Sequence, residues 1–272
     1  MKSILPALAL VFLISCGNTK NDNKANFPKL HEMAENIPNK ENVWVFIMAG
    51  QSNMAGRGIV APQDTIPNPR ILSINSKNKL ILAKEPLHFY EPNLAGLDCG
   101  HSFGKTLLEH VPDSVSLLIL PTAVGGSSVT QWVNDSIYRD VQLLTNFKEK
   151  VAIGEKYGTI KGILWHQGES DANAHDIPLY KDKLSSLFYT FRTTIGNDSL
   201  PIILGELGAY SETQEEWGAI NKIINEFPST DENTSVISLS DLKDKGDEVH
   251  FNTKGFRTMG KRYAEAYIKQ SN

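Results

Sequence analysis

A serine, a histidine and an aspartate, the three side chains that hydrolyse esters together, occur in favourable positions in this chain. Ser52 directly follows an apolar run, and Asp247 and His250 lie three positions apart near the carboxyl terminus. In such a triad the imidazole takes the serine proton, while the carboxylate orients the imidazole and offsets its charge. A turn between Asp247 and His250 would bring the carboxylate to one ring nitrogen and leave the other for Ser52. These residues therefore predict a serine nucleophile.

Acyl transfer also needs hydrogen-bond donors for the oxyanion that develops on the substrate. The candidates are the N–H of Ser52, an N–H from the pair Gly125 and Gly126, and the side-chain amide of Gln167. Taken singly, each has a structural explanation, because a serine often caps a helix and paired glycines often form a turn. Their joint occurrence after separate apolar runs favours catalysis.

Positioning these residues requires a sheet whose strands all end at the same edge. Five apolar runs are expected to be strands: residues 43–50, 115–120, 159–165, 200–204 and 235–239. Helical patterns are expected at residues 100–111, 137–153, 178–195, 213–227 and 253–269. Residues 70–74 and 79–83 are expected to form a small accessory β-hairpin.

The alternation of strands and helices predicts an α/β fold. We expect one domain, a three-layer α/β/α sandwich with a central five-stranded parallel sheet and helices on both faces. Because strand-to-helix crossovers are right-handed, the polar loops after the strands gather at one edge of the sheet. Ser52, the glycine pair and Gln167 would meet there.

Four motifs in this order resemble the SGNH hydrolase superfamily. They are Gly-Gln-Ser-Asn at 50–53, Gly-Gly-Ser at 125–127, His-Gln-Gly-Glu-Ser-Asp at 166–171 and Asp-Glu-Val-His at 247–250. More narrowly, the set is similar to the branch of sialate O-acetylesterases and acetylxylan esterases, which remove O-acetyl groups from sugars. The resemblance runs from about residue 43 to the carboxyl terminus and implies a flavodoxin-like sandwich.

Carried over position by position, the resemblance implies catalytic roles for five residues. Ser52 would be the nucleophile, His250 the general base and then acid, and Asp247 its orienting acid. The oxyanion donors would be the backbone of Ser52, Gly126 and the side chain of Gln167. An α/β-hydrolase is disfavoured, because its motif needs a second glycine two positions after the serine.

Some assignments stay open. Glu169 is an alternative or auxiliary acid for His250. Trp132 fits core packing and a sugar-stacking wall equally well. The substrate pocket is expected to include Gln51, Asn53, Gly125 and Trp132, with loops 59–69, 86–99 and 132–140 around it. No metal ion or cofactor is required, because serine, imidazole and amides complete the machinery.

The amino terminus is a different kind of sequence. Lys2, an apolar segment at 4–14 and Leu-Ile-Ser-Cys at 13–16 resemble a bacterial lipoprotein signal with its lipobox. The resemblance implies a signal peptide at 1–16, a lipid on Cys16 and a place in the cell envelope, on the periplasmic face or the cell surface. A plain secretory peptide is the alternative. The polar residues 17–42 are expected to be a flexible tether to the esterase domain, 43–272.

The composition excludes one class of partner. The net charge of −4 and the lack of a long basic run argue against nucleic acid. The expected partners are an acetylated carbohydrate and, through the lipid, a membrane. Two further functions remain as alternatives: a non-catalytic carbohydrate-binding lipoprotein on an esterase scaffold, and an SGNH esterase of another acyl substrate. Cys99 would be the remaining thiol after signal cleavage, and we expect it to be buried or half-buried.

Overall fold

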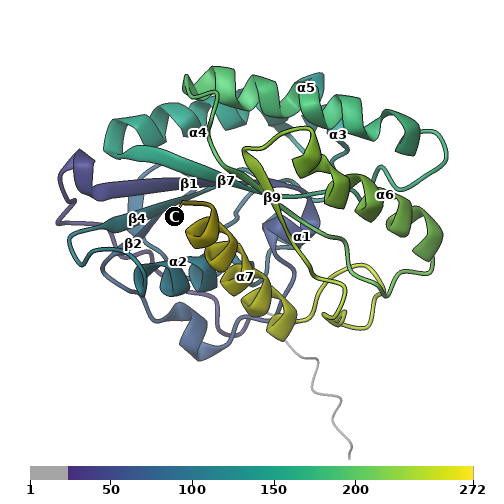
Figure 1. The fold of residues 1–272 in the computed structure, drawn as a ribbon. Helices are drawn as coiled ribbons and strands as arrows, with labels where there is room; N and C mark the ends of the chain where they lie inside the picture. Colours follow the sequence, from purple (N-terminus) through teal and green to yellow (C-terminus); the bar gives the residue numbers. More distant parts are fainter. Residues whose placement is uncertain (1–23, 272) are drawn as a thin grey trace, which may run out of the picture.

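A seven-stranded sheet runs through the middle of the protein, which is described from residue 24 to residue 271 in this computed structural model (Figure 1). In sheet order the strands are β3 (Leu80–Leu82), β2 (Ile71–Ile74), β4 (Ser116–Pro121), β1 (Val43–Gly50), β7 (Thr159–His166), β8 (Ile202–Gly205) and β9 (Thr234–Ile237). All described pairings in this sheet are parallel except that of β3 with β2. The α/β/α class and the five predicted strands are confirmed.

The strand count was predicted too low because the hairpin is not an accessory. Its first strand, β2, pairs in parallel with β4, with Ile71 opposite Leu117 and Leu72 opposite Leu118. The strand residues of the hairpin are buried except for the half-buried Leu82, so they extend the central sheet and its core. Two strands alone are barely stable, and pairing with β4 supplies the missing support.

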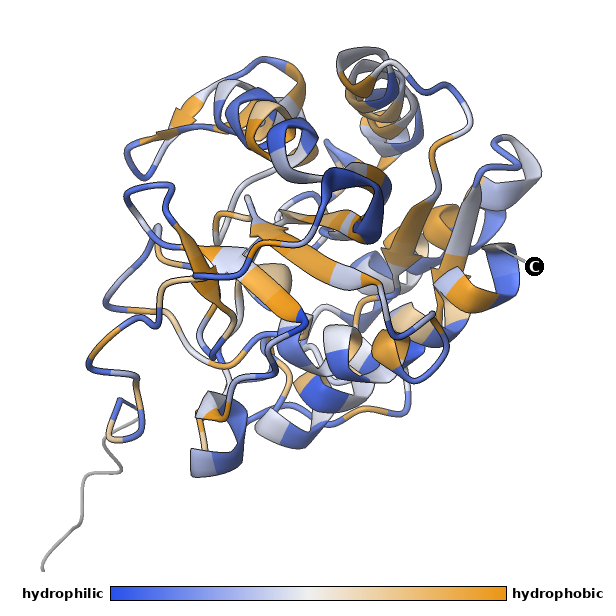
Figure 2. Cartoon of the chain, turned by 90° about the vertical axis from the view of Figure 1, so that its left-hand side faces the viewer, coloured by the Kyte–Doolittle hydropathy of each residue, from blue (hydrophilic) through white to orange (hydrophobic). Residues whose placement is uncertain are grey.

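Helices cover both faces of the sheet (Figure 1). On one face lie α3 (Val129–Val133), α4 (Leu143–Tyr157), α5 (Ile177–Ile195) and α6 (Gln214–Glu226). On the other face lie α2 (Gly100–Leu108) and α7 (Thr253–Ser271). The short helix α1 (Ser52–Ala55) follows β1, and 3-10 turns occur at Lys40–Asn42, Pro62–Thr65 and Phe227–Ser229. Figure 2 shows largely apolar strands between helices that mix apolar and polar residues.

Strand β1 lies at the centre of the sheet, and its side chains pack into the hydrophobic cores on both faces. Successive side chains of a strand point to opposite faces. Val45 and Ile47 join the core under α4 and α5, while Phe46 and Met48 join the core under α2 and α7. All four are fully buried, as a near-continuous apolar run in a doubly covered sheet requires.

The helix predicted at residues 137–153 begins later than expected. Residues 137–142 form a two-stranded hairpin of β5 (Ile137–Tyr138) and β6 (Val141–Gln142), with Arg139 and Asp140 at positive φ in its turn. The helix α4 then starts at Leu143, and the Asp135 carboxylate accepts the N–H of Thr145 at 2.7 Å. That carboxylate caps the start of the helix, and the residues before it pair as strands.

Residues 24–42, the part of the predicted 17–42 tether that the structure describes, contact the domain at the outer edge of β3. The N–H of Ala34 donates to the carbonyl of Leu80 at 3.2 Å, and the N–H of Leu82 donates to the carbonyl of Glu32 at 2.8 Å. The edge strand β3 has unpaired backbone groups on its outer side, and this segment pairs with them. Residues 32–34 therefore lie along the edge of the sheet.

The predicted signal peptide and the lipidation residue Cys16 lie outside the described residues. Within residues 24–271, no helix combines the length and apolar character needed to cross a membrane. Cys99 is fully buried, as predicted, and burial raises the pKa of its thiol.

Gly50 gives a test of how tightly β1 is held at its end. It has φ of +133°, and a Cβ there would lie 2.0 Å from the carbonyl oxygen of His166 on β7. We expect Gly50→Ala to lower the free energy of unfolding by about 2–4 kcal/mol, because both the backbone and the neighbouring strand oppose the methyl group. Denaturant unfolding followed by circular dichroism measures this change.

Gly218 is the matched control for that measurement. It lies in the interior of α6, and a Cβ there would meet nothing within 4 Å. Gly218→Ala should raise the free energy of unfolding by about 0.5–1 kcal/mol, since alanine favours helix. Equal destabilisation by the two substitutions would contradict the tight approach of β1 and β7.

Candidate active site

Ser52, His250 and Asp247 are in hydrogen-bond contact. Ser52 Oγ lies 3.0 Å from His250 Nε2, and His250 Nδ1 lies 2.8 Å from Asp247 Oδ2. Ser52 is only 6% exposed, and the His250 side chain is 20% exposed. The chain therefore brings together the serine, imidazole and carboxylate that the sequence singled out, although 198 positions separate the first two.

A short helix and a loop position these three side chains. Ser52 opens α1 immediately after β1, so its hydroxyl stands at the carboxyl edge of the sheet. Asp247 and His250 lie in the loop between β9 and α7, and Asp247 Oδ1 accepts the N–H of His250 at 2.8 Å and that of Val249 at 3.2 Å. One carboxylate therefore holds both the loop backbone and the imidazole, which limits rotation of the ring.

The side chain of Asn53 connects the helix of Ser52 to the loop that carries His250. Its Nδ2 donates to the carbonyl of Val249 at 2.9 Å and to Glu169 Oε1 at 2.7 Å, and its Oδ1 accepts the N–H of Phe251 at 3.1 Å. Asn53 is fully buried and lies behind the pocket, so the prediction that it lines the pocket is wrong. Its three bonds instead fix the distance between Ser52 and His250.

The charges around the triad suit a general base. Burial lowers the pKa of His250, with Lys245 and Arg57 acting in the same direction and the Asp247 carboxylate opposing them. Burial acts to raise the pKa of Asp247, but the hydrogen bonds from His250 and Val249 hold that pKa well below its usual value. At neutral pH the imidazole is neutral and the carboxylate is ionised, as proton abstraction requires.

Two of the predicted oxyanion donors are available. Within residues 24–271 the N–H groups of Ser52 and Gly126 have no hydrogen-bond acceptor, and both residues line the same pocket. Gly126 has φ of +82°, a conformation that favours glycine, and a Cβ there would lie 2.9 Å from the hydroxyl of Tyr138. The tight turn therefore requires glycine at this position.

The third predicted donor, Gln167, points away from the pocket. Its side chain is fully buried, and Nε2 donates to Asp171 Oδ2 at 2.5 Å, to Gln51 Oε1 at 3.1 Å and to the carbonyl of Ser127 at 3.2 Å. Three acceptors already occupy this amide, so it offers no N–H to a substrate. The structure contradicts the assignment of Gln167 as an oxyanion donor.

Glu169 does not orient His250 in this arrangement. Asp247 occupies the Nδ1 side of the imidazole, while Glu169 Oε1 accepts from Asn53 and lies 3.6 Å from the Nδ1 of His166. The other oxygen, Oε2, is buried without a partner among the described residues. Of the two open assignments for the acid, the geometry selects Asp247.

The triad opens into a cavity of about 580 Å³. Gln51 and Gly125 line it as predicted, and so do Asn93 to Ala95 and Arg139 from two of the three expected loops. Loop 59–69 contributes none of the lining. Sequence reasoning missed the lining cations Lys24, Arg57 and Lys245, because a single Lys or Arg forms no motif. Lys245 lies two positions before Asp247 and pairs with it at 3.3 Å.

Trp132 belongs to the core and forms no wall of the pocket. Its side chain is fully buried, its Nε1 donates to Ser127 Oγ at 2.9 Å, and its ring packs edge-on against Trp165 and Phe191. The prediction that Trp132 lines the substrate pocket is therefore wrong. The indole N–H finds its acceptor inside the protein, which allows complete burial of the ring.

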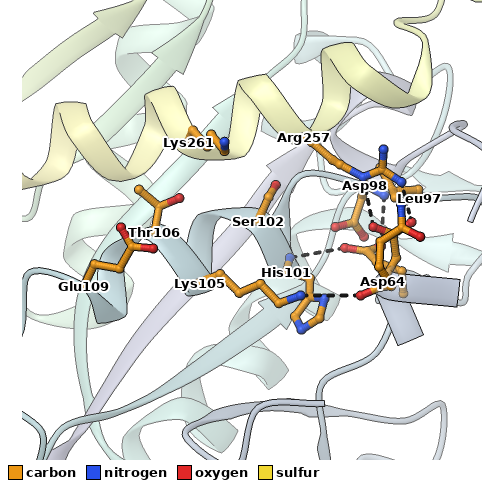
Figure 3. Close-up of a pocket in the computed structure, with 12 residues that line it drawn as sticks. Asp64, Leu97, Asp98, His101, Ser102, Lys105, Thr106, Glu109, Arg257 and Lys261 are labelled. Atoms are coloured by element: carbon orange, nitrogen blue, oxygen red, sulfur yellow. Dashed lines mark hydrogen bonds and ion pairs between the residues drawn. The ribbon is translucent and has the colours of Figure 1, made fainter. Parts of the chain in front are cut away.

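A second cavity, of about 330 Å³, lies between α2 and α7 and also holds a serine and a histidine (Figure 3). There the Ser102 hydroxyl donates to the carbonyl of Cys99 at 3.0 Å, and the His101 ring points away from it. Arg257 pairs with Asp64 through two contacts of 2.6 and 2.9 Å. This cavity contains no nucleophile–base pair. Nowhere in residues 24–271 are three or more His, Cys, Asp or Glu side chains grouped to hold a metal ion.

Comparison with known families agrees with this geometry. Residues 42–269 match the family model described as carbohydrate esterase, sialic acid-specific acetylesterase. The chain belongs to this carbohydrate esterase family. It is therefore a carboxylic ester hydrolase, and the resemblance that the four motifs indicated is confirmed.

Proteins similar to this carbohydrate esterase occur in plants and bacteria. A probable carbohydrate esterase of Arabidopsis thaliana is 28% identical over 246 residues, which cover 82% of this chain and 90% of the relative. A solved structure of an Arabidopsis thaliana protein aligns with a TM-score of 0.74 and 27% identity, covering 84% of this chain and 98% of that one. A carbohydrate acetylesterase from Xanthomonas citri has the same fold, with a TM-score of 0.64 and 17% identity over 82% of this chain and 55% of its own.

The pH dependence of this carbohydrate esterase should report the imidazole of His250. Only neutral His250 accepts the serine proton, so kcat/KM should rise with pH through the pKa of His250 and then level off. Since that pKa is lowered from its ordinary value of 6.5, we expect the half-maximal rate below pH 6.5. Initial rates on a chromogenic acetate ester between about pH 4.5 and 8.5 measure the profile. An inflection above pH 7 would contradict burial as the dominant influence on His250.

Proposed function

We propose that this carbohydrate esterase removes O-acetyl groups from sugars through an acetyl-enzyme on Ser52. The observation that carries the proposal is the 3.0 Å contact between Ser52 Oγ and His250 Nε2, with Asp247 on the other ring nitrogen. A serine activated by a neutral, oriented imidazole is the arrangement that acyl transfer needs. No cofactor or metal takes part in this scheme.

The proposed reaction has two halves. His250 Nε2 takes the Oγ proton as Ser52 attacks the acetyl carbonyl carbon, and the N–H groups of Ser52 and Gly126 bind the resulting oxyanion. The bond to the sugar oxygen then breaks, and that oxygen leaves with the proton from His250. In the second half, water attacks the acetyl-enzyme while His250 takes its proton, and acetate leaves as Ser52 Oγ regains a proton.

The charge of the pocket lining points to one class of sugar. Four basic residues line the cavity, Lys24, Arg57, Arg139 and Lys245. The carboxylates Glu169 and Asp247 in the lining and Glu91 behind it offset three of these charges, so one excess positive charge remains. A surplus of positive charge in a cleft attracts an anionic substrate. An acetylated sugar that also carries a carboxylate, such as an O-acetylated sialic acid, fits this lining better than neutral acetylated xylan does.

Acetate release from the two substrates tests both levels of the proposal. At equal concentrations we expect faster release from O-acetylated sialic acid than from acetylated xylan oligosaccharides, and the preference should shrink with added salt. A preference for xylan would overturn the substrate assignment and leave the esterase mechanism standing. Binding of both sugars without any acetate release would favour the non-catalytic carbohydrate-binding alternative.

We further propose that the chain is an exported lipoprotein held in the cell envelope by a lipid on Cys16. The support is the amino-terminal sequence, in which a short apolar segment ends in Leu-Ile-Ser-Cys. In a bacterial host, the full chain should incorporate labelled fatty acid and sediment with membranes, whereas Cys16→Ser should do neither. A Cys16→Ser protein that still carries the label would overturn the proposal.

A further inference from the structure

Glu91 is a buried carboxylate that stands behind the wall of the catalytic pocket. It lies between β3 and α2 and is 8% exposed, and it belongs to none of the predicted catalytic groups. The turn that follows it does line the pocket: the N–H groups of Leu94 and Ala95 donate to the Glu91 carbonyl at 2.9 and 2.8 Å. Both the backbone and the side chain of Glu91 are therefore tied to the cavity.

The carboxylate of Glu91 binds three parts of the pocket wall that come from separate segments. Its Oε2 accepts from Arg57 Nη2 at 2.8 Å and from the N–H of Gly125 at 2.6 Å, and its Oε1 accepts from Arg139 Nη1. Arg57 follows α1, Gly125 follows β4, and Arg139 sits in the turn between β5 and β6. All three line the cavity that holds Ser52.

The contact with Gly125 has a direct bearing on catalysis. Gly125 is adjacent to Gly126, whose N–H is a proposed oxyanion donor. A Cβ at Gly125 would lie 2.1 Å from Arg57 Nη2 and 2.7 Å from Glu91 Oε2, so the backbone there lies directly against the ion pair. The Gly126 N–H belongs to the next peptide unit, whose direction depends on φ and ψ of Gly125. The N–H bond to Glu91 and the Arg57–Glu91 pair packed against the Gly125 Cα restrict rotation about these two angles.

Glu91 is charged in this setting. Burial acts to raise the pKa of Glu91, but the guanidinium of Arg57, the N–H of Gly125 and the guanidinium of Arg139 together hold that pKa below its usual value. Hydrogen bonds to an ionised acceptor are stronger and shorter than neutral ones. A charged Glu91 therefore holds all three partners more firmly than a neutral side chain of the same shape would.

We propose that Glu91 is a positioning residue that fixes the Gly126 N–H for the oxyanion and sets the place of the two arginines in the substrate pocket. The proposal rests on the proposed function, since it assumes that Gly126 binds the oxyanion. Glu91 acts through Gly125 and the arginines, and it does not touch the substrate.

Glu91→Gln is the variant that tests this role, because it keeps the shape and removes the charge. The substrate is a small chromogenic acetate ester, which occupies the oxyanion site and extends little toward the arginines. The rate is divided by the concentration of active sites, which is measured by labelling Ser52 with an organophosphate. Misfolded protein is not labelled and therefore does not affect the rate per site. We expect kcat per labelled site to fall about 10- to 100-fold, with a much smaller change in KM, because the oxyanion donor is misplaced.

Two further variants serve as controls for Glu91→Gln, one at the surface and one that keeps an acid at position 91. Asp113→Asn removes an acid whose fully exposed side chain pairs with Arg70, and it should leave kcat unchanged. Glu91→Asp retains the charge at a shorter reach, so it should recover part of the kcat lost in Glu91→Gln. Wild-type kcat per site in Glu91→Gln would overturn the positioning role alone, whereas a wild-type protein that never turns over the ester would count against the proposed function itself.

Discussion

Replacing Ser52 by alanine should lower kcat/KM on an acetate ester by at least about 10³-fold, because no other group supplies a nucleophile to the carbonyl carbon. The contact of Ser52 Oγ with His250 is lost, while the backbone donors and the pocket remain. Any residual rate would come from those donors acting on water. Steady-state rates with a chromogenic acetate measure the loss, and the protein should unfold at close to the wild-type denaturant midpoint.

Ser102→Ala is the matched control for that experiment. Ser102 is a partly buried serine next to a histidine, but its hydroxyl donates to the carbonyl of Cys99 in the second cavity (Figure 3). The control variant should keep wild-type kcat/KM. Turnover retained in Ser52→Ala, or lost in Ser102→Ala, would contradict Ser52 as the nucleophile. Loss in Ser102→Ala would move the active site to the second cavity.

Asp247→Asn should be the second most damaging substitution, with kcat lowered by about 10²- to 10⁴-fold. The carboxylate accepts from His250 Nδ1 at 2.8 Å and from the N–H of His250 at 2.8 Å. An amide at this position no longer offsets the positive charge of the imidazolium, and its NH₂ favours the wrong tautomer of the ring. The pH profile should change as well, because the carboxylate raises the pKa of His250.

Glu169→Gln is the comparison that decides between the two acids. Glu169 Oε1 accepts from Asn53 at 2.7 Å, a bond that the glutamine carbonyl can keep. We therefore expect a smaller loss of kcat than in Asp247→Asn, measured on the same ester. A larger loss in Glu169→Gln would move the acid assignment from the loop before α7 to the loop after β7.

The sequence left two candidates, Asp247 and Glu169, for the carboxylate that orients His250. Asp247 and Glu169 are both near a strand end, and both have the right chemical type. The three-residue spacing of Asp247 and His250 favoured that pair, but the choice depends on which carboxylate reaches Nδ1. That distance is set by the packing of the β9–α7 loop against α1 through Asn53, a contact between segments 196 and 198 positions apart.

Buried polar side chains were the least predictable part of the site. Gln167 has the amide that an oxyanion site needs, yet its Nε2 donates to three acceptors inside the protein, Gln51, Ser127 and Asp171. Trp132 was compatible with a pocket wall and with the core, and the hydroxyl of Ser127 made burial of its indole N–H possible. In each case the outcome depended on acceptors that come together only when the loops are folded.

The sequence alone determined the fold class, five strands of the central sheet in their order along the chain, and the serine and histidine of the site. These follow from local chemistry, since apolar runs end at small residues and side-chain type sets reactivity. The tertiary structure alone decided that the hairpin joins the sheet, that Asp247 is the acid, and that Glu91 stands behind the oxyanion loop. Each of these depends on hydrogen-bond partners from distant segments, and a buried polar group takes the partner that the packing places within reach.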